Sequence, residues 1–267
     1  YIYVQSYPLG APAPKCNPAS HNKISVIKVP LDDPASAEVV STPSVAPAIG
    51  CHDVTVVPPK HIAVAACISE SQVWDIKDPA NPTVLAHIYN PEINIHHSSQ
   101  LTWDGKILAL GDEAGGGGAN ACAGQQDTTT GAMWFYDLTD PSNPQQVGHY
   151  ALPRTPAPEE VCTTHNFDII PMNDPKKYIA TPAYYDGGLS VVDFSDPAAP
   201  KELAYYVPEL EDGTPATMWS VYWYNGRLYE NGEDGNLRVF EVDGTGAADT
   251  QYFKGRLNPQ VWLPTFK

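Results

Sequence analysis

Four short segments carry polar or aromatic residues at matching points of strand-like runs. They are Cys51-His52-Asp53, His96-His97-Ser98, Thr164-His165-Asn166 and Met218-Trp219-Ser220. Three of them place a histidine at the shared position, and the fourth places a tryptophan there. Imidazole nitrogens brought to one point suit Zn, Fe, Cu or Ni. Glu113 follows another strand-like run and can add a carboxylate.

These segments stand in a chain that repeats itself. An apolar strand, an Asp-Pro-x-x-Pro turn and a second strand recur in three stretches, which are Trp74–Ile88, Met133–Tyr150 and Leu189–Tyr206. Looser copies lie at Ile24–Thr42 and Leu237–Val242. Such internal repetition is typical of architectures built from one supersecondary unit.

The Asp-Pro-x-x-Pro turn has a local physical reason. Aspartate caps its own turn, and proline fixes φ at the second turn position. We therefore expect Asp75, Asp137 and Asp193, at the ends of their strands, to be turn ligands rather than catalysts.

Each repeat contains four strand-like pieces joined by short connectors, which permit only antiparallel neighbours. A four-stranded antiparallel unit repeated in series is a blade of a β-propeller. We predict an all-β propeller forming one domain over residues 1–267. The expected blades are 1–45 (incomplete, lacking a first strand), 50–90, 95–152, 162–208 and 217–256, followed by a tail at 257–267. Two stacked β-sandwiches would have the strands but would not explain the repeat.

Ring closure has two solutions. The tail either supplies the missing first strand and closes a five-bladed ring, or the chain is the C-terminal part of a six- or seven-bladed ring. The first residues already alternate like a strand, so we favour the second solution and expect further sequence upstream of Tyr1.

In a propeller the first strands line the central channel, so the shared positions converge on its axis. The predicted metal ligands are His52, His97, His165 and Glu113. Asp53, Asn166 and Trp219 are expected at the channel mouth as ligands or as latches between blades. A second interpretation is that the histidines have a structural role and only hold neighbouring blades together. A third is that they are acid–base catalysts.

The composition limits the class of binding partner and the cellular compartment of this protein. The 15 Lys and Arg against 31 Asp and Glu give a net charge of −16, which argues against nucleic acid. No apolar run reaches the roughly 18 residues of a membrane span. The five cysteines form no CxxC pair. We expect disulfides Cys51–Cys67 and Cys122–Cys162, with Cys16 left over, in an exported protein. The alternative is buried free thiols in the cytosol.

The repeats resemble a known family. SVVDFSDPAAP, VWDIKDPANP and WFYDLTDPSNP resemble the LVIVD repeat of exported bacterial and archaeal proteins. The extended pattern of secreted LVIVD-repeat propellers is similar to GCHDVTV, INIHHSSQLTWDGKILALGDE, CTTHNFDIIP and MWSVYWYNGRLYENG. The resemblance implies a propeller, further upstream blades in relatives, and export, often with cell-surface attachment. It implies little about activity.

The first functional hypothesis is a secreted or cell-surface propeller that acts as a binding or scaffold module in an extracellular assembly. Trp262 and Phe266 of the tail are then candidate exposed contacts with a protein partner. The second is a metal-dependent hydrolase or oxidase that uses one divalent ion at the channel mouth. The third is a structural subunit of a surface layer or filament. We lean away from catalysis.

Overall fold

The computed structural model describes residues 1–5, 22–118, 121–122, 129–154, 157–242, 246–255, 258 and 260–263. Cys16 and Phe266, singled out in the sequence, lie outside the described residues. Part of the segment 114–130, which the sequence predicts to be a long insertion in the blade 95–152, and part of the tail also lie outside them.

The described residues fold into five antiparallel sheets whose strands follow chain order. Sheet 1 contains β1 (Ile2–Gln5), β2 (Ile24–Lys28) and β3 (Glu38–Ser41). Sheet 2 contains β4 (Asp53–Val57), β5 (Ile62–Ala66), β6 (Ser71–Asp75) and β7 (Thr83–Ile88). Sheet 3 contains β8 (His96–Leu101), β9 (Ile107–Asp112), β10 (Met133–Asp137) and β11 (Gln145–Tyr150).

Sheet 4 contains β12 (Phe167–Ile170), β13 (Ile179–Pro182), β14 (Leu189–Asp193) and β15 (Lys201–Tyr206). Sheet 5 contains β16 (Met218–Tyr224), β17 (Arg227–Gly232) and β18 (Leu237–Glu241). Two short 3₁₀ turns are η2 (Pro34–Ser36) and η3 (Pro58–Lys60). No helix in the described part of the chain is long and apolar enough to cross a membrane.

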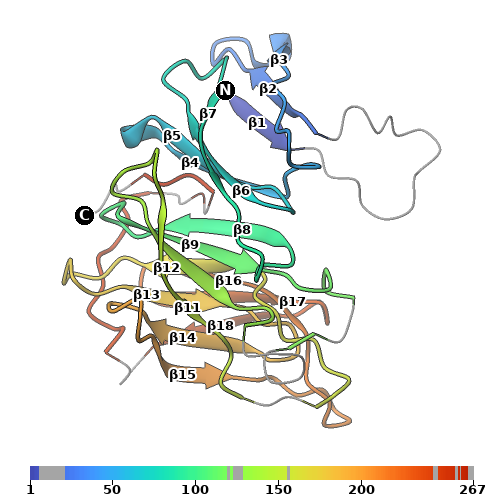
Figure 1. The fold of residues 1–267 in the computed structure, drawn as a ribbon. Coiled ribbons are helices and arrows are strands. Elements are labelled where there is room, and N and C mark those ends of the chain that lie inside the picture. The colour runs from blue at the N-terminus through green and yellow to red at the C-terminus, as the bar shows by residue number, and fades with distance from the viewer. Residues whose placement is uncertain are drawn as a thin grey trace.

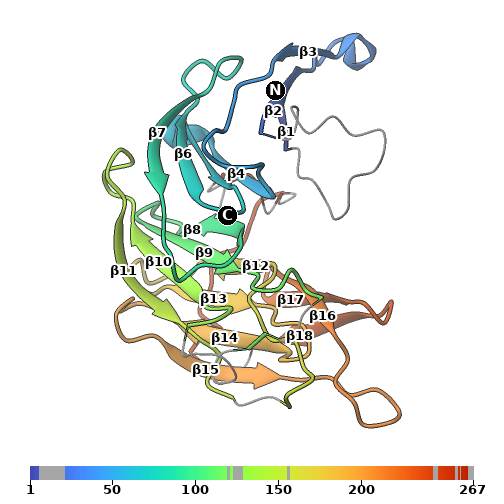
Figure 2. The same ribbon diagram turned by 45° about the vertical axis from the view of Figure 1, so that its right-hand side comes forward.

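The sheets fan around a common centre like the blades of a propeller (Figure 1). Strands β4, β8, β12 and β16 lie side by side as the inner strands of sheets 2 to 5. The described sheets form an arc that is open between sheets 1 and 5 (Figure 2). The predicted all-β propeller fold is therefore confirmed.

The Asp-Pro turns are built as the sequence predicted. Asp75, Asp137 and Asp193 each accept a hydrogen bond from the backbone N–H two residues on, over 2.8, 2.8 and 2.9 Å. Because each turn satisfies its own backbone, it joins the third and fourth strands without help from the rest of the fold.

One apolar layer fills the space between each pair of neighbouring sheets. Between sheets 3 and 4, the rings of Phe135 and Phe194 stack with centroids 4.6 Å apart. Between sheets 4 and 5, Val221, Trp223 and Leu228 are buried against the inner strands of sheet 4. Sheets 2 to 4 are therefore buried on both faces, which explains why their second and third strands, such as β5 and β10, are largely apolar.

The end of the chain departs from one prediction, the fourth strand of sheet 5, and from the less favoured of the two ring closures. The segment expected to give sheet 5 a fourth strand instead lies against the loop after β12, where Gln251 N–H donates to Pro171 O over 2.7 Å. Val261 in the tail pairs in parallel with Val56 of β4 rather than adding a strand to sheet 1.

The predicted exposure of Trp262 is also wrong. Its side chain is buried, and its Nε1–H donates to Thr102 O over 3.0 Å. The indole packs in the layer between sheets 2 and 3 because the tail pairs with β4.

Candidate functional site

β-Bulges aim two of the predicted side chains out of their sheets. In β8, His96 pairs with Asp112 and Ser98 pairs with Gly111, so His97 is the extra residue. In β16 the same shift lies between Met218 and Ser220 and leaves Trp219 as the extra residue. A bulge re-aims the residue that it leaves unpaired. Both therefore project at the same end of the inner strands.

The other two histidines precede their strands. His52 N–H donates to Ala66 O over 2.7 Å, and His165 N–H donates to Ala183 O over 2.9 Å. These bonds extend the ladders of sheets 2 and 4 toward the same end of the channel, which is called the mouth below.

The structure brings the three histidines and the tryptophan into one row. Ring centroids are 3.9 Å apart for His52 and His97, 4.4 Å for His97 and His165, and 4.3 Å for His165 and Trp219. Each ring comes from a different sheet. The sequence register therefore corresponds to contact across four sheets.

Glu113, directly after β9, lies against this row. Its Oε2 is 3.6 Å from His97 Nε2, and its Oε1 is 3.6 Å from His165 Nε2. The Tyr185 hydroxyl donates a hydrogen bond to Oε1. Gly117 leaves room for this hydroxyl, because a Cβ at position 117 would lie 2.5 Å from it.

Sequence reasoning missed Tyr185. It lies in the connector Tyr184-Tyr185-Asp186-Gly187-Gly188, which resembles an ordinary turn. No motif marks it, and only the fold places it opposite Glu113.

Burial favours the uncharged form of each of these side chains over its charged form. Desolvation lowers the pKa of His97 well below its usual range, and neighbouring His165 and His52 lower it further. Desolvation also lowers the pKa of His165 to about 4 and raises that of Glu113. Neutral imidazole is the form of histidine that ligates metals.

The spacing of the donor atoms suits a metal ion. One ligand atom each from His52, His97 and Glu113 lies within 4.8 Å of the others. In a tetrahedral site with bonds of about 2.1 Å, ligand atoms are about 3.4 Å apart. The two 3.6 Å separations between imidazole nitrogens and the Glu113 carboxylate are close to that value.

Hydrogen bonding leaves nitrogens directed at the carboxylate. His165 Nδ1 is 2.5 Å from Trp219 O, and an N–H at Nδ1 is the only group of the pair that can donate. Its Nε2 is then the basic nitrogen facing Glu113, the arrangement usual for a metal-ligating histidine. Neither ring nitrogen of His97 has a hydrogen-bond partner, although the side chain is only 1% exposed.

Asp53 and Asn166 lie further along the inner strands and not among the residues that line the mouth. Asp53 accepts hydrogen bonds from Val54 N–H and from the Gln260 side chain. Asn166 Nδ2 donates to Tyr222 Oη over 2.9 Å. The contacts with Gln260 and Tyr222 join neighbouring parts of the fold.

Both predicted disulfides are present, Cys51–Cys67 and Cys122–Cys162. The first adjoins His52. The second joins Cys122, in the connection between β9 and β10, to the segment that leads to His165. A backbone hydrogen bond from Cys162 N–H to Ala121 O joins the same two segments. Each bond therefore restrains a segment that carries a site histidine.

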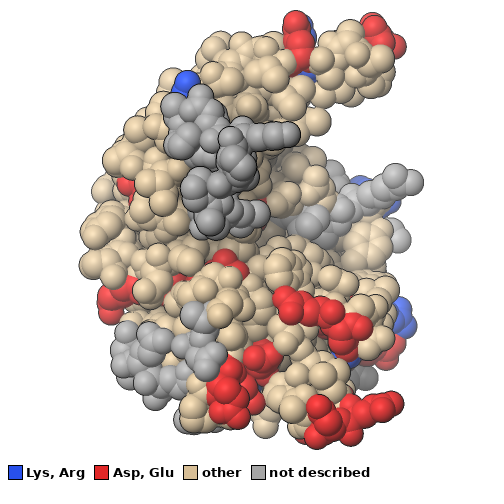
Figure 3. All heavy atoms as spheres, turned by 90° about the vertical axis from the view of Figure 1, so that its right-hand side faces the viewer, with Lys and Arg blue, Asp and Glu red and all other residues tan. Residues whose placement is uncertain are grey.

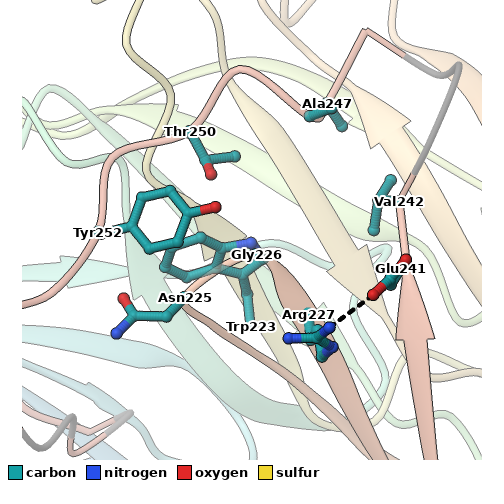
Figure 4. Close-up of a pocket in the computed structure, with 10 residues that line it drawn as sticks. Trp223, Asn225, Gly226, Arg227, Glu241, Val242, Ala247, Thr250 and Tyr252 are labelled. Carbon is teal, nitrogen blue, oxygen red and sulfur yellow. Dashed lines mark hydrogen bonds and ion pairs between the residues drawn. The ribbon is translucent and has the colours of Figure 1, made fainter.

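The mouth is a hollow of about 420 Å³ above the histidine row. A second hollow, of about 240 Å³, lies at the turn between β16 and β17 (Figure 4). Trp223 and Tyr252 line it, and Arg227 pairs with Glu241 at its edge over 2.6 Å. It contains none of the residues singled out in the sequence, so the mouth is the better candidate site.

No family model and no curated protein matches the chain. Solved structures do resemble it. The periplasmic gluconolactonase PpgL of Pseudomonas aeruginosa superposes with a TM-score of 0.55 at 15% identity, over 84% of this chain and 61% of its own. Hydrazine synthase of Kuenenia stuttgartiensis gives 0.57 at 13% identity, over 85% and 60%.

A Lactobacillus plantarum protein gives a TM-score of 0.55 at 13% identity, over 82% of this chain and 64% of its own. The chain thus spans less than two thirds of the length of these three proteins. At such identities the likeness concerns the fold alone. Together with the sheet order, it defines the class of this protein as a β-propeller.

Proposed function

We propose that this chain is an exported binding propeller that holds one divalent transition-metal ion at its mouth. His52, His97 and Glu113 supply ligands, with His165 Nε2 facing the second carboxylate oxygen of Glu113. The ion presents its remaining coordination positions to the hollow above, where a ligand or a group on a partner protein binds. We also propose that the chain belongs with the LVIVD-repeat propellers, on its three Asp-Pro repeats.

The imidazole of His97, which makes no hydrogen bond, carries this proposal. A buried polar group without a partner costs about 1–3 kcal/mol, and folded proteins rarely contain one without a reason. Both of its ring nitrogens are buried and lack hydrogen bonds, with a carboxylate oxygen 3.6 Å from Nε2. A bound cation would satisfy the imidazole and the carboxylate together.

Two observations support export and a binding role. Disulfides persist in oxidising compartments, and the chain has two. The surface is acidic, and Asp and Glu side chains gather on the face shown in Figure 3. An acidic exterior disfavours nucleic acid and leaves a protein or a small molecule as the partner.

The test is metal binding by the purified protein. Protein prepared without chelator is analysed for bound metal, and metal-free protein is titrated with Zn²⁺ by calorimetry. We expect about one equivalent in the wild type and none in His97→Ala. His87→Ala is the matched control, because His87 is half-exposed on β7 and pairs with Glu70 outside the mouth. It should bind Zn²⁺ like the wild type.

A wild-type protein that binds no Zn²⁺, Cu²⁺, Ni²⁺ or Fe²⁺ would refute the proposal. So would a His97→Ala protein that is folded and binds metal with unchanged affinity. The histidines would then be latches between sheets.

A metal-dependent enzyme is the second candidate, because two of the three ligand residues, His52 and Glu113, border an open hollow. Catalytic metal sites keep an open coordination position. Hydrolysis of ester or lactone probes by the metal-loaded protein, abolished in His97→Ala and kept in His87→Ala, would favour it.

A further inference from the structure

The mouth combines an aromatic corner with carboxylates. Its described lining includes Glu113, Glu233, Tyr185 and Trp219 and contains no Lys or Arg. The backbone of Gly116 and Gly118 borders it without side chains. These features point to what the mouth binds, and the argument rests on the metal site proposed above.

The charges in the mouth favour a neutral ligand. A divalent cation held by the Glu113 carboxylate contributes two positive charges, and the carboxylates of Glu113 and Glu233 contribute two negative ones. The lining offers no cationic side chain for a phosphate or a sulfate. An ammonium ligand would be repelled by the metal ion. The balance therefore selects an uncharged molecule whose polar groups approach the ion and the carboxylates.

Trp219 provides a flat apolar surface at the rim. Trp219 is 42% exposed although its ring contacts His165, because the bulge in β16 turns it away from the sheet. The ring of Tyr185 meets it edge-on, with centroids 6.0 Å apart and planes at 90°. Two perpendicular rings form a corner that can hold one face and one edge of a small ring.

Beside this corner the mouth accepts hydrogen bonds. Glu233 is exposed on the loop after β17, and its backbone N–H is held by Thr217 O over 3.0 Å. The Gly116 to Gly118 stretch leaves space, since a Cβ at Gly116 would meet only Ile95 Cδ1 at 3.7 Å. A ligand with hydroxyl groups around its edge can donate to Glu233 and place other hydroxyl oxygens on the metal ion.

We infer that the mouth binds a neutral, polyhydroxylated ring of monosaccharide size. The C–H face of the ring stacks on Trp219, two adjacent hydroxyls approach the metal ion, and others donate to Glu233. The hollow of about 420 Å³ lies within the usual range of ligand pockets, about 300–1,000 Å³.

The experiment titrates zinc-loaded protein with D-glucose, D-galactose and D-mannose, followed by calorimetry and saturation-transfer NMR. Choline and glucose 6-phosphate test the cationic and anionic alternatives. We expect at least one neutral sugar to bind, and to bind more weakly when the metal is removed. Trp219→Leu, which keeps apolar bulk but no ring, should weaken binding about tenfold, or about 1.4 kcal/mol. Trp219→Phe should keep most of it.

Tyr252→Ala is the matched control, because Tyr252 is an exposed aromatic residue at the second hollow (Figure 4). It should bind sugar like the wild type. The zinc content of each variant is measured first. Loss of the ion is thereby distinguished from loss of the aromatic surface of Trp219.

The outcomes separate the two proposals. If zinc binds and none of the three sugars does, the ligand inference is wrong and the metal site stands. If choline or glucose 6-phosphate binds in place of the sugars, the inference is overturned in favour of a charged ligand. If no metal binds, the proposed function fails first. Equal sugar affinity in Trp219→Leu and wild type would also refute the stacking geometry.

Discussion

Asp168 is an acid sealed between sheets 4 and 5, and its titration should be visible in the stability of the whole fold. The side chain is 3% exposed. Its oxygens accept hydrogen bonds from Ile169 N–H at 2.8 Å and from Trp223 N–H, on β16, at 3.0 Å. Burial raises its pKa from 3.8 to about 7, against the opposing effect of the two hydrogen bonds.

The sign of the pH dependence follows from that shift. In the unfolded chain the pKa stays near 3.8, so between about pH 4 and pH 7 the folded state holds a proton that the unfolded state has lost. The contribution of Asp168 to the free energy of unfolding is therefore highest below about pH 4 and falls as the pH rises to about 7. Three pKa units at 1.36 kcal/mol each correspond to about 4 kcal/mol. Tyr222, the ionisable neighbour on β16, keeps its proton because burial raises its pKa.

Asp168→Asn isolates this effect. The amide cannot ionise, but its nitrogen cannot accept, so one of the two backbone N–H groups loses its partner at a cost of about 1–3 kcal/mol at every pH. We expect the variant to be less stable than the wild type near pH 4.5. Between pH 4.5 and pH 8 the difference should shrink by about 3 kcal/mol and reach or pass zero.

The assay is urea unfolding of both proteins from about pH 4.5 to pH 8 with disulfides intact, followed by tryptophan fluorescence. Taking the difference between the proteins cancels the titration of the histidines. Asp78→Asn is the control, since Asp78 is exposed in a turn and hydrogen bonds lower its pKa, so that it does not titrate within the pH range of the assay. Parallel curves for Asp168→Asn and wild type across this range would refute the reasoning.

Three further predictions concern packing and covalent restraint. Gly148→Ala should lower stability by about 1–3 kcal/mol, because its Cβ would lie 1.8 Å from the backbone oxygen of Pro197, whereas Gly255→Ala, with nothing within 4 Å, should melt like the wild type. Trp262→Ala should cost about 3–5 kcal/mol in urea unfolding, and the exposed Leu263→Ala much less; equal effects would contradict the tail packing. Removing the disulfides singly by Cys-to-Ser replacement should cost about 3 and about 4 kcal/mol, from loops of 16 and 40 residues. Unchanged melting temperatures would show that loop closure contributes little here.

The local elements of this fold can be predicted from its sequence because their causes are local. The Asp-Pro turns satisfy their own backbone, and the short connectors force antiparallel neighbours. The repeat then implies stacked sheets, and the cysteine spacing within the repeat implied both disulfides. The histidine register could be recognised for the same reason, since equivalent positions of repeated sheets converge on one axis.

The tail and the detail of the mouth depend on contacts that no local pattern encodes. The tail pairs with β4, some 200 residues earlier in the chain, and this buries Trp262. The bulges that aim His97 and Trp219 into the mouth are decided by cross-strand register. Tyr185 meets Glu113 only because sheets 3 and 4 pack face to face.

The sequence by itself thus determined the repeating sheets, their turns, the disulfides and the row of histidines. Each of these follows from a locally determined unit that recurs along the chain. Only the tertiary structure decided which oxygen faces which nitrogen, which aromatic ring stays exposed and where the tail packs. Those depend on the sub-ångström balance of packing and hydrogen bonding between segments that are distant in the chain.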